Sequence, residues 1–173
     1  RVMTTRYMPK SEIQIKIVDS HTPFAIDDIQ ITPFPVPHDA REPTQFVFSD
    51  GQYRLGVLTD VGGTTPYIQQ VLSGCDALVL ECNHDLSMLE TGPYSYALKK
   101  RVGGHLGHLD NQSAAHLLAT LDNSKLKHIV AAHLSAKNNT QALAKSALSQ
   151  VLSCDADWIG IATQNTGFDW RSV

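Results

Sequence analysis

The first half of the chain alternates apolar and polar positions, as half-buried strands do. Alternation of this kind predicts strands at residues 13–18, 24–31, 45–49 and 53–59. The last two segments bracket a turn over residues 49–52, which carries a Ser-Asp-Gly-Gln string. This part of the sequence therefore predicts a meander of antiparallel hairpins.

The second half changes to short apolar strands with helices between them. Residues 77–81, 128–132 and 158–162 are continuous apolar runs, typical of strands that are covered on both faces. Helical spacing of apolar residues predicts helices at 65–72, 94–102, 112–121 and 140–152, and Asn111 and Thr140 are suitable N-cap residues. A meander followed by β-α-β-α-β describes an α/β sandwich with a mixed sheet and helices packed outside it.

Composition indicates one globular domain over residues 1–173. The chain is 42% hydrophobic and 18% charged, and it contains no internal repeat or linker. Its apolar runs are far shorter than the roughly 20 residues of a membrane-spanning helix, so no membrane partner is expected. The chain begins at Arg1 with no apolar signal segment, which suggests that position 1 lies inside a longer protein.

Cysteine usage and charge limit the classes of function. The three cysteines, Cys75, Cys82 and Cys154, form no Cys-x-x-Cys pair, which favours a reducing compartment and a cytoplasmic location. A net charge of -3 argues against a nucleic-acid binder that works by bulk charge. The only run of three cations, residues 99–101, is either an ordinary solvated helix face or a local contact with phosphates.

Four ionisable residues stand where predicted strands end. They are His38, Asp60, Glu81 and His133. Each of them alone is an ordinary turn, cap or core residue. Together, at strand ends and followed by small or polar residues, they are typical of a hydrolytic metal centre, in which imidazole and carboxylate bind a divalent ion and acidify its water.

Two further histidines, His105 and His108, stand three apart just before a predicted helix. They are either a metal-binding pair or part of a glycine-flanked loop that leads into the helix, and we favour His108 as the functional one. The remaining histidines are expected to be surface or packing residues, with His84 kept as a minor candidate because it lies close to Glu81 in the sequence.

Five short motifs occur in order along the chain: PVPHDA (35–40), LTDVG (58–62), LECNHD (80–85), GHLDN (107–111) and AHLS (132–135), the last followed by Asn138 and Asn139. They resemble the later motifs of the metallo-β-lactamase superfamily. The order and spacing are most similar to its bacterial YycJ/WalJ-like branch, whose relatives include ribonuclease Z and phosphodiesterases of phosphonate metabolism. The resemblance extends from about residue 29 to residue 170.

The resemblance implies an αββα sandwich that holds two divalent ions, zinc or manganese, at one edge of its sheets. By this resemblance His38 would bind the first ion, Asp60 would bridge both ions, and His133 would bind the second. Glu81 and His108 resemble an acid–histidine pair beside the reacting phosphate. Glu81 would fix the tautomer of His108, which would steady the phosphoryl oxygen or protonate the leaving group. The implied catalytic residues are thus Asp60, Glu81 and His108, and the implied substrate is a phosphodiester, including one in nucleic acid.

One departure from the family pattern is large. Members carry a His-x-His-x-Asp-His string that supplies most of the metal ligands, and none occurs in these 173 residues. Each ion would then have two protein ligands, whereas a zinc site usually has about three. We therefore expect this chain to be the carboxyl-terminal part of the enzyme, an incomplete sandwich that alone binds metal weakly and turns over little. A smaller departure is Asp110, which replaces a serine and is still suited to a helix start.

Two other functions remain open at this point. A truncated member could keep the scaffold as a non-catalytic binding module, or the same fold could hydrolyse a thioester or a lactam. The sequence also leaves the oligomeric state open, a homo-oligomer included.

Overall fold

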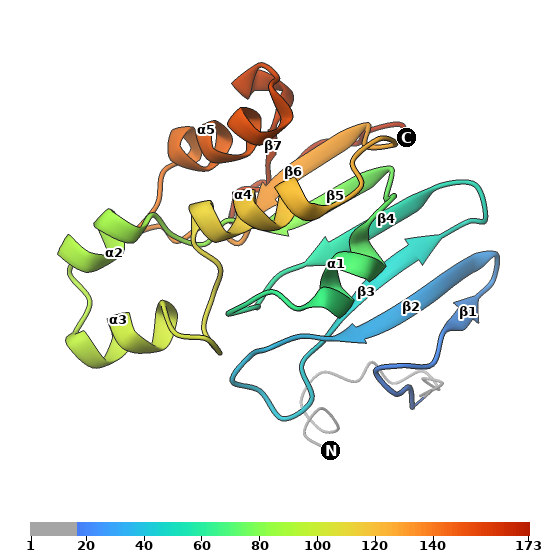
Figure 1. Cartoon of the computed structure of the whole chain (residues 1–173), viewed down its shortest axis with the longest axis horizontal. Helices are drawn as coiled ribbons and strands as arrows, with labels where there is room; N and C mark the ends of the chain where they lie inside the picture. The colour runs from blue at the N-terminus through green and yellow to red at the C-terminus, as the bar shows by residue number, and fades with distance from the viewer. Residues whose placement is uncertain (1–16) are drawn as a thin grey trace.

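The computed structural model describes residues 17–173, and within this range a single seven-stranded sheet organises the fold (Figure 1). Its strands lie side by side in sequence order: β1 (Phe24–Ile26), β2 (Ile29–Pro35), β3 (Thr44–Ser49), β4 (Arg54–Leu58), β5 (Ala77–Glu81), β6 (His128–Ala132) and β7 (Gly160–Ile161). Neighbours from β1 to β4 pair antiparallel, and neighbours from β4 to β7 pair parallel. The mixed α/β architecture predicted from the sequence is confirmed.

Among the described residues are five α-helices, three of which cover one face of the sheet while the other two extend beyond its edge (Figure 1). The five helices are α1 (Pro66–Leu72), α2 (Leu86–Thr91), α3 (Tyr96–Val102), α4 (Asn111–Thr120) and α5 (Gln141–Leu152), with a 3₁₀ helix at Ala156–Trp158. The core lies between α1, α4, α5 and the sheet, where Leu80 and Ile129 pack with Leu117 and Leu148. Within residues 17–173, no helix is both long and apolar enough to span a membrane.

The opposite face of the sheet has no helix layer among the described residues. Leu78 and Leu80 point into the core and are buried, whereas Val79 between them is only half-buried on this second face. The carboxyl-terminal segment crosses the face and encloses a hollow of about 390 Å³, lined by Leu55, Val79 and Trp170 among others. The described fold is therefore one sheet with helices packed on one of its faces.

Several predicted element boundaries are wrong, each for a local reason. The strand expected over residues 24–31 is a hairpin, because Asp27 takes a left-handed conformation with φ 49° and turns the chain between β1 and β2. The strand expected over 158–162 shortens to β7, because the Asp155 side chain caps the 3₁₀ helix at its start. The strand expected over 13–18 falls mainly outside the described residues, and residues 17 and 18 are not in a strand.

Helix starts depend on which side chain accepts from the first amides. Thr140 caps α5 as predicted, with its hydroxyl accepting from the amide of Leu143. At α4 the predicted cap Asn111 is instead the first helical residue, because Asp110 accepts from the amides of Gln112 and Ser113. Helix α2, which the apolar pattern did not predict, begins after Asp85, whose carboxylate accepts from Met88.

The sheet brings four strand ends to one edge. In the parallel part, Leu58 pairs with Leu80 and Glu81 pairs with Ala132, so β4, β5 and β6 end level with one another. Strand β2 runs in the same direction, because both β2 and β4 are antiparallel to β3. The loops that follow these strands therefore meet on the left side of the sheet in Figure 1.

These loops are tied together through their backbones. The amide of Gly62 donates to the carbonyl of Pro37 at 2.8 Å, and the amide of Asp39 donates to the carbonyl of Leu106 at 3.0 Å. A Cβ on Gly62 would collide with the amide nitrogen of Gly107 and with backbone atoms of His105. Only glycine permits this close approach of the loop after β4 to the loop before α4.

Gly62→Ala should therefore lower the free energy of unfolding by about 3 kcal/mol, since backbone atoms on the facing loop have to move. Gly63→Ala is the matched control, because its Cβ would meet only the movable imidazole of His105, at 2.9 Å. We expect the control to change stability by less than about 1 kcal/mol. Urea denaturation measures both, and equal losses would contradict the close approach.

Candidate metal centre

A buried carboxylate lies at the middle of the strand-end cluster. Glu81 is the last residue of β5 and is fully buried. Its Oε1 accepts from Nδ1 of His108 at 2.8 Å and from Nδ1 of His133 at 2.6 Å. Its Oε2 accepts from the amides of Val61 at 3.0 Å and Leu109 at 3.4 Å. These four bonds fill the lone-pair sites of the carboxylate, so Glu81 orients its neighbours and has none left for an ion.

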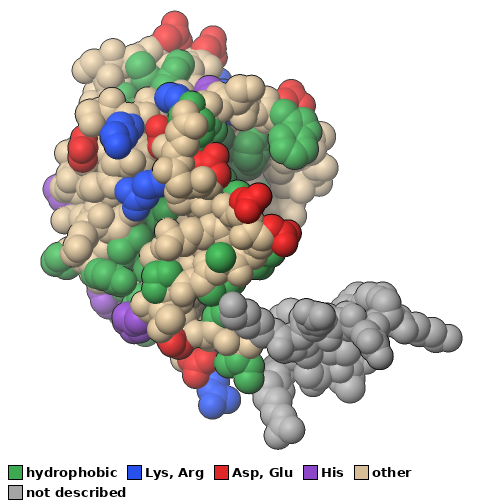
Figure 2. Space-filling view, turned by 90° about the vertical axis from the view of Figure 1, so that its right-hand side faces the viewer, with side chains coloured by type: hydrophobic (Ala, Val, Ile, Leu, Met, Phe, Trp, Pro, Cys, Tyr) green, Lys and Arg blue, Asp and Glu red, His purple; other side chains and the backbone are tan. Residues whose placement is uncertain are grey.

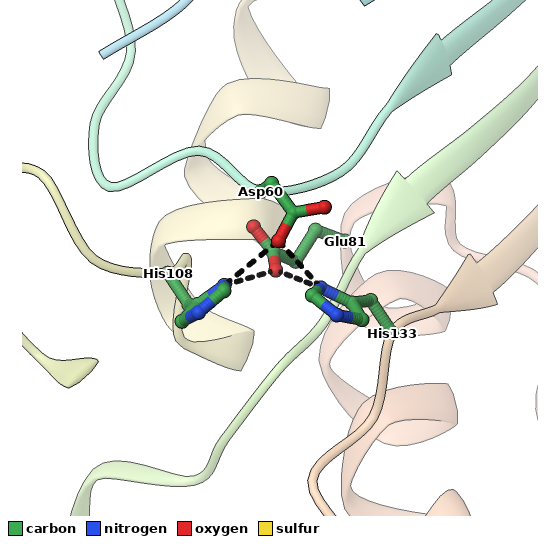
Figure 3. Close-up of side chains that lie close together, drawn as sticks. All are labelled: Asp60, Glu81, His108 and His133. Atoms are coloured by element: carbon green, nitrogen blue, oxygen red, sulfur yellow. Dashed lines mark hydrogen bonds and ion pairs between the residues drawn. The ribbon is translucent and has the colours of Figure 1, made fainter. Parts of the chain in front are cut away.

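A second carboxylate, Asp60, faces the histidines without bonding to them directly (Figure 3). Its Oδ1 lies 3.7 Å from Nε2 of His38, 3.7 Å from Nδ1 of His133 and 3.9 Å from Nδ1 of His108. The imidazole rings lie close to one another, with centroids 5.3 Å apart for His38 and His108 and 5.1 Å apart for His108 and His133. One oxygen thus stands among three imidazoles at distances longer than a hydrogen bond.

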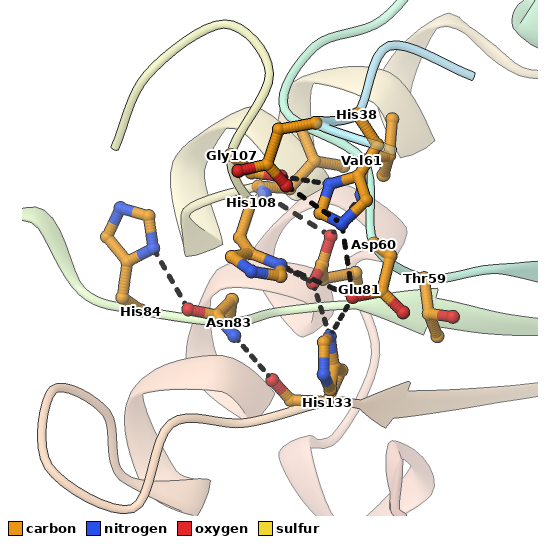
Figure 4. Close-up of polar contacts among 12 residues, drawn as sticks. His38, Thr59, Asp60, Val61, Glu81, Asn83, His84, Gly107, His108 and His133 are labelled. Carbon is orange, nitrogen blue, oxygen red and sulfur yellow. Dashed lines mark hydrogen bonds and ion pairs between the residues drawn. The ribbon is translucent and has the colours of Figure 1, made fainter. Parts of the chain in front are cut away.

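The tautomer of His38 follows from its partner. Its Nδ1 lies 3.0 Å from the carbonyl oxygen of Gly107, and a carbonyl can only accept, so Nδ1 carries the proton. The lone pair is then on Nε2, which points toward Asp60 in Figure 4. An imidazole fixed in this way by a backbone carbonyl is the usual arrangement of a metal-binding histidine.

Two residues of the cluster have unusual backbones. Asp60 has φ 52° and His133 has φ 57°, so both lie in the left-handed region that residues other than glycine rarely adopt. Such conformations cost of order 1–3 kcal/mol and persist where surrounding contacts hold them. For His133 those contacts are the Glu81 bond and a bond from the Asn83 side chain to its carbonyl, at 2.9 Å.

The electrostatics of the cluster centre on Glu81 and His133. Burial by itself would raise the pKa of Glu81, but the hydrogen bonds from the two imidazoles and the Val61 amide outweigh it and hold this pKa below its ordinary value. The hydrogen bond to Glu81 raises the pKa of His133 above its ordinary value, despite partial burial. The metal-free cluster therefore favours an ionised Glu81 beside a protonated His133.

The residues named from the sequence come together as expected in space. His38, Asp60 and His133 converge on the Asp60 oxygen, and Glu81 bonds to His108 as the resemblance implied. The roles given to these residues stay predictions. Sequence reasoning missed that Glu81 bonds to His133 as well, although β5 and β6 are neighbours with Glu81 paired to Ala132.

The other histidine candidates lie outside the cluster. His105 is exposed and faces Gly63, while Figure 4 shows the ring of His84 turned away from Asp60. His84 is buried, and burial lowers its pKa. His21 and His116 are exposed, and His128 lies at the opposite end of β6, where it contacts the carbonyl of Ser172.

Two supporting residues were not identified from the sequence. Asn83 joins the histidine-bearing loops, because its amide donates to the carbonyl of Leu109 and its side chain donates to the carbonyl of His133. Asp39 lies 3.5 Å from Nε2 of His38 and pairs with Arg101 at 2.6 Å. Both stand next to a predicted site residue within the quoted motifs, which is the only signal that pointed to them.

The donor set is suited to a divalent ion. One ligand atom from each of Asp60, Glu81, His108 and His133 lies within 4.8 Å of the others, and the free Nε2 of His38 faces the same oxygen. Imidazole nitrogen and carboxylate oxygen together suit zinc and manganese. Since the Glu81 carboxylate is already saturated and Nδ1 of His108 and His133 donates to it, the atoms available to hold an ion are the Asp60 oxygens and Nε2 of the histidines around it.

Comparison with known proteins identifies the family. Residues 2–133 match the profile of the Beta-lactamase superfamily domain, which is most of the chain. This chain therefore belongs to the β-lactamase superfamily, and its sheet and helices are the metallo-β-lactamase fold.

Curated relatives place it more narrowly. The chain is 39% identical over 125 residues to exodeoxyribonuclease YycJ of Bacillus anthracis, covering 72% of this chain and 47% of that protein. It is 34% identical over 117 residues to exodeoxyribonuclease WalJ of Streptococcus pneumoniae, covering 68% of this chain and 44% of that protein. The resemblance to the YycJ/WalJ-like branch is thus confirmed, and the chain spans about half the length of these relatives.

A solved structure has the same fold at lower identity. The metallo-beta-lactamase fold protein YhfI from Bacillus subtilis superimposes with a TM-score of 0.64 and 16% identity, over 89% of this chain and 54% of that chain. At this level of identity the likeness concerns the fold alone.

Glu81→Gln should lower the pKa of His133, because the substitution removes the charge that holds the imidazole protonated. The titration of the His133 Cε1 proton by NMR, in metal-free protein, measures the shift. Asp60→Asn is the matched control. Asp60 contributes the smallest of the named effects on His133, so its removal should lower this pKa less.

The same pair predicts a pH window for stability. Because the pKa of His133 is raised above 6.5, its contribution is complete below pH 6.5 and is lost as pH rises through the raised value. Because the pKa of Glu81 is lowered below 4.5, its contribution is complete above pH 4.5 and is lost as pH falls through the lowered value. The metal-free protein should therefore gain most from the pair between pH 4.5 and 6.5. A Glu81→Gln variant with an unchanged stability profile would contradict the assignment.

Proposed function

We propose that this chain is the carboxyl-terminal part of a metal-dependent phosphodiesterase that acts on nucleic acid. The observation that carries the proposal is the position of the Asp60 oxygen among three imidazoles, beside the saturated carboxylate of Glu81. This arrangement provides ligand atoms of the right kind and fixes their orientation before any ion binds.

Each residue has a role that follows from its contacts. His38 through Nε2 and Asp60 through its carboxylate would hold one ion, and Asp60 with His133 would hold a second. When bound, two such ions supply an acidified water and neutralise charge on the phosphoryl oxygens.

His108 acts differently, although Glu81 orients it in the same way as His133. It is less exposed than His133, and its Nδ1 lies farther from Asp60, at 3.9 Å instead of 3.7 Å. Its Nδ1 donates to Glu81 at 2.8 Å, which fixes the orientation of the ring. We assign His108 to steadying a phosphoryl oxygen or to giving a proton to the leaving group.

The curated relatives favour DNA as the substrate. Both are named exodeoxyribonucleases, so hydrolysis of phosphodiester bonds from a DNA end is the specific form of the proposal. Zinc and manganese are the ions that suit the donors. The three free thiols, Cys75, Cys82 and Cys154, are consistent with a reducing, cytoplasmic compartment.

The remaining metal ligands have to come from residues other than His38, Asp60 and His133. His38, Asp60 and His133 give each ion two protein ligands, fewer than the three usual for zinc. We propose that a preceding segment with a His-x-His-x-Asp-His string completes both sites. The 173-residue chain alone is then expected to hydrolyse phosphodiesters at a small fraction of the rate of the complete protein.

In the complete protein, Asp60→Ala should lose both ions and abolish hydrolysis of bis-p-nitrophenyl phosphate, because both ions share this carboxylate. His108→Ala should keep the ions and lower kcat by about 10²- to 10⁴-fold, the usual effect of removing a proton-transfer group. Inductively coupled plasma mass spectrometry and steady-state kinetics measure the two effects.

Three outcomes would contradict the assignment. An empty site in His108→Ala would make that residue a ligand, and both ions retained in Asp60→Ala would remove the bridge. Faster turnover of a thioester or a cephalosporin than of the diester would replace the proposed substrate class.

A further inference from the structure

The segment that carries α2 and α3 extends away from the sheet beside the candidate metal centre. Figure 1 shows both helices at the left, at the edge where the strand-end loops meet. Helix α3 buries none of its residues, and α2 buries only Leu89. The segment therefore contributes little to the core, and many of its side chains are exposed.

The cations of the chain's only triple run are on this segment. Arg101 is engaged, since its Nε pairs with Asp39 at 2.6 Å. Lys99 donates from Nζ to the backbone carbonyl of Glu90 at 2.6 Å. Because a carbonyl is neutral, this bond does not neutralise the positive charge of Lys99. The Nζ of Lys100 lies 4.9 Å from the centroid of the Tyr96 ring. In a chain of net charge -3, two lysines are thus available to anions here.

An exposed aromatic ring accompanies these cations. Tyr96 is 72% exposed, so its ring is accessible to a ligand. It lines a hollow of roughly 690 Å³ together with Leu86, Leu89, Glu90, Lys99, Lys100 and Gly103. Two lysines and one glutamate give the lining of this hollow a net positive charge, and the two leucines make the rest of the lining apolar.

A second, smaller hollow connects the segment to the metal centre. It has a volume of roughly 250 Å³, and both His108 and His133 line it together with Tyr94. Tyr94 is two residues before Tyr96, and Val102 at the end of α3 lines the same hollow. The hollow beside the histidines and the hollow beside Tyr96 share no lining residue, but the same α2–α3 segment borders both of them.

We propose that the α2–α3 segment binds an unpaired nucleic-acid strand and leads its end into the metal centre. The proposal rests on the proposed function. Bases stack on the Tyr96 ring, and Lys99 and Lys100 contact the phosphates that follow, a combination that sequence-independent single-strand binders use. A duplex hides the faces of its bases, so it gains the phosphate contacts without the stacking.

The opposite end of the sheet provides a matched control. Strands β4 and β6 begin at the right in Figure 1, and the face seen from that side in Figure 2 carries acidic and basic side chains intermixed. There Lys127 lies 4.2 Å over the ring of Tyr53, a pair of the same kind as Lys100 and Tyr96. The Lys127–Tyr53 pair lies at the opposite end of the sheet from the candidate metal centre, so a strand bound along the α2–α3 segment would not reach this pair.

The test measures binding of a fluorescein-labelled dT20 oligonucleotide to the complete protein by anisotropy, with EDTA present to prevent cleavage. Tyr96→Ala should weaken binding by about 5- to 100-fold, and Tyr96→Phe should restore it to within about twofold. Lys100→Ala should reduce the slope of log Kd against log salt concentration by about 0.7, which is the contribution of one phosphate contact on a single strand. A blunt duplex of equal length should lose less affinity than dT20 in Tyr96→Ala.

Tyr53→Ala and Lys127→Ala should leave both the Kd and the hydrolysis of bis-p-nitrophenyl phosphate unchanged. The proposal is overturned by no binding of dT20 to the wild type, by an unchanged Kd in Tyr96→Ala, by equal losses for dT20 and duplex, or by equal losses in the control variants. Wild-type hydrolysis of bis-p-nitrophenyl phosphate is a separate readout. Its absence would refute the proposed function, whereas unaltered dT20 binding in Tyr96→Ala would refute only the strand path.

Discussion

The burial of one carboxylate, Glu81, determines how the loops at the sheet edge are arranged. A carboxylate out of contact with water is strongly unfavourable unless hydrogen bonds replace its hydration. Glu81 obtains four of them, from His108, His133 and the backbone amides of Val61 and Leu109. Its position at the end of the central parallel strand is what lets it reach the loops on both sides. Three loops that are distant in sequence are thereby held in one geometry.

That geometry turns a common fold into a site with specific chemistry. The Val61 amide is next to Asp60, so the bond to Glu81 also restrains the carboxylate that faces the imidazoles. The left-handed backbone conformations of Asp60 and His133 are energetically unfavourable, and they persist because these contacts hold them in place. Glu81 and the backbone amides thus fix the orientation of the side chains that face Asp60, as outer hydrogen-bonding groups do for the ligands of metal centres. The α2–α3 segment, which adds almost nothing to the core, is free to present lysines and an aromatic ring to a ligand.

Much of this arrangement was predictable from the sequence, and the reasons for success and failure are physical. Period-two alternation and continuous apolar runs predicted the mixed sheet, because strand faces repeat every second residue. Ionisable residues at strand ends predicted which side chains come together, because parallel strands end at one edge of the sheet. The bond between Glu81 and His133 was missed, since it depends on the register of β5 and β6. The Asp110 cap moved the start of α4 by one residue, and the helix that begins after Asp85 has only 6 residues, which is too short to show a period.

In the proposed metal centre, two ions share Asp60 and Glu81 binds neither of them. Anomalous diffraction from manganese-soaked crystals of the complete protein tests this most directly. We predict two anomalous peaks with the Asp60 carboxylate between them, one beside Nε2 of His38 and the other beside the His133 ring. A single peak bound to Glu81, or peaks away from Asp60, would contradict the account.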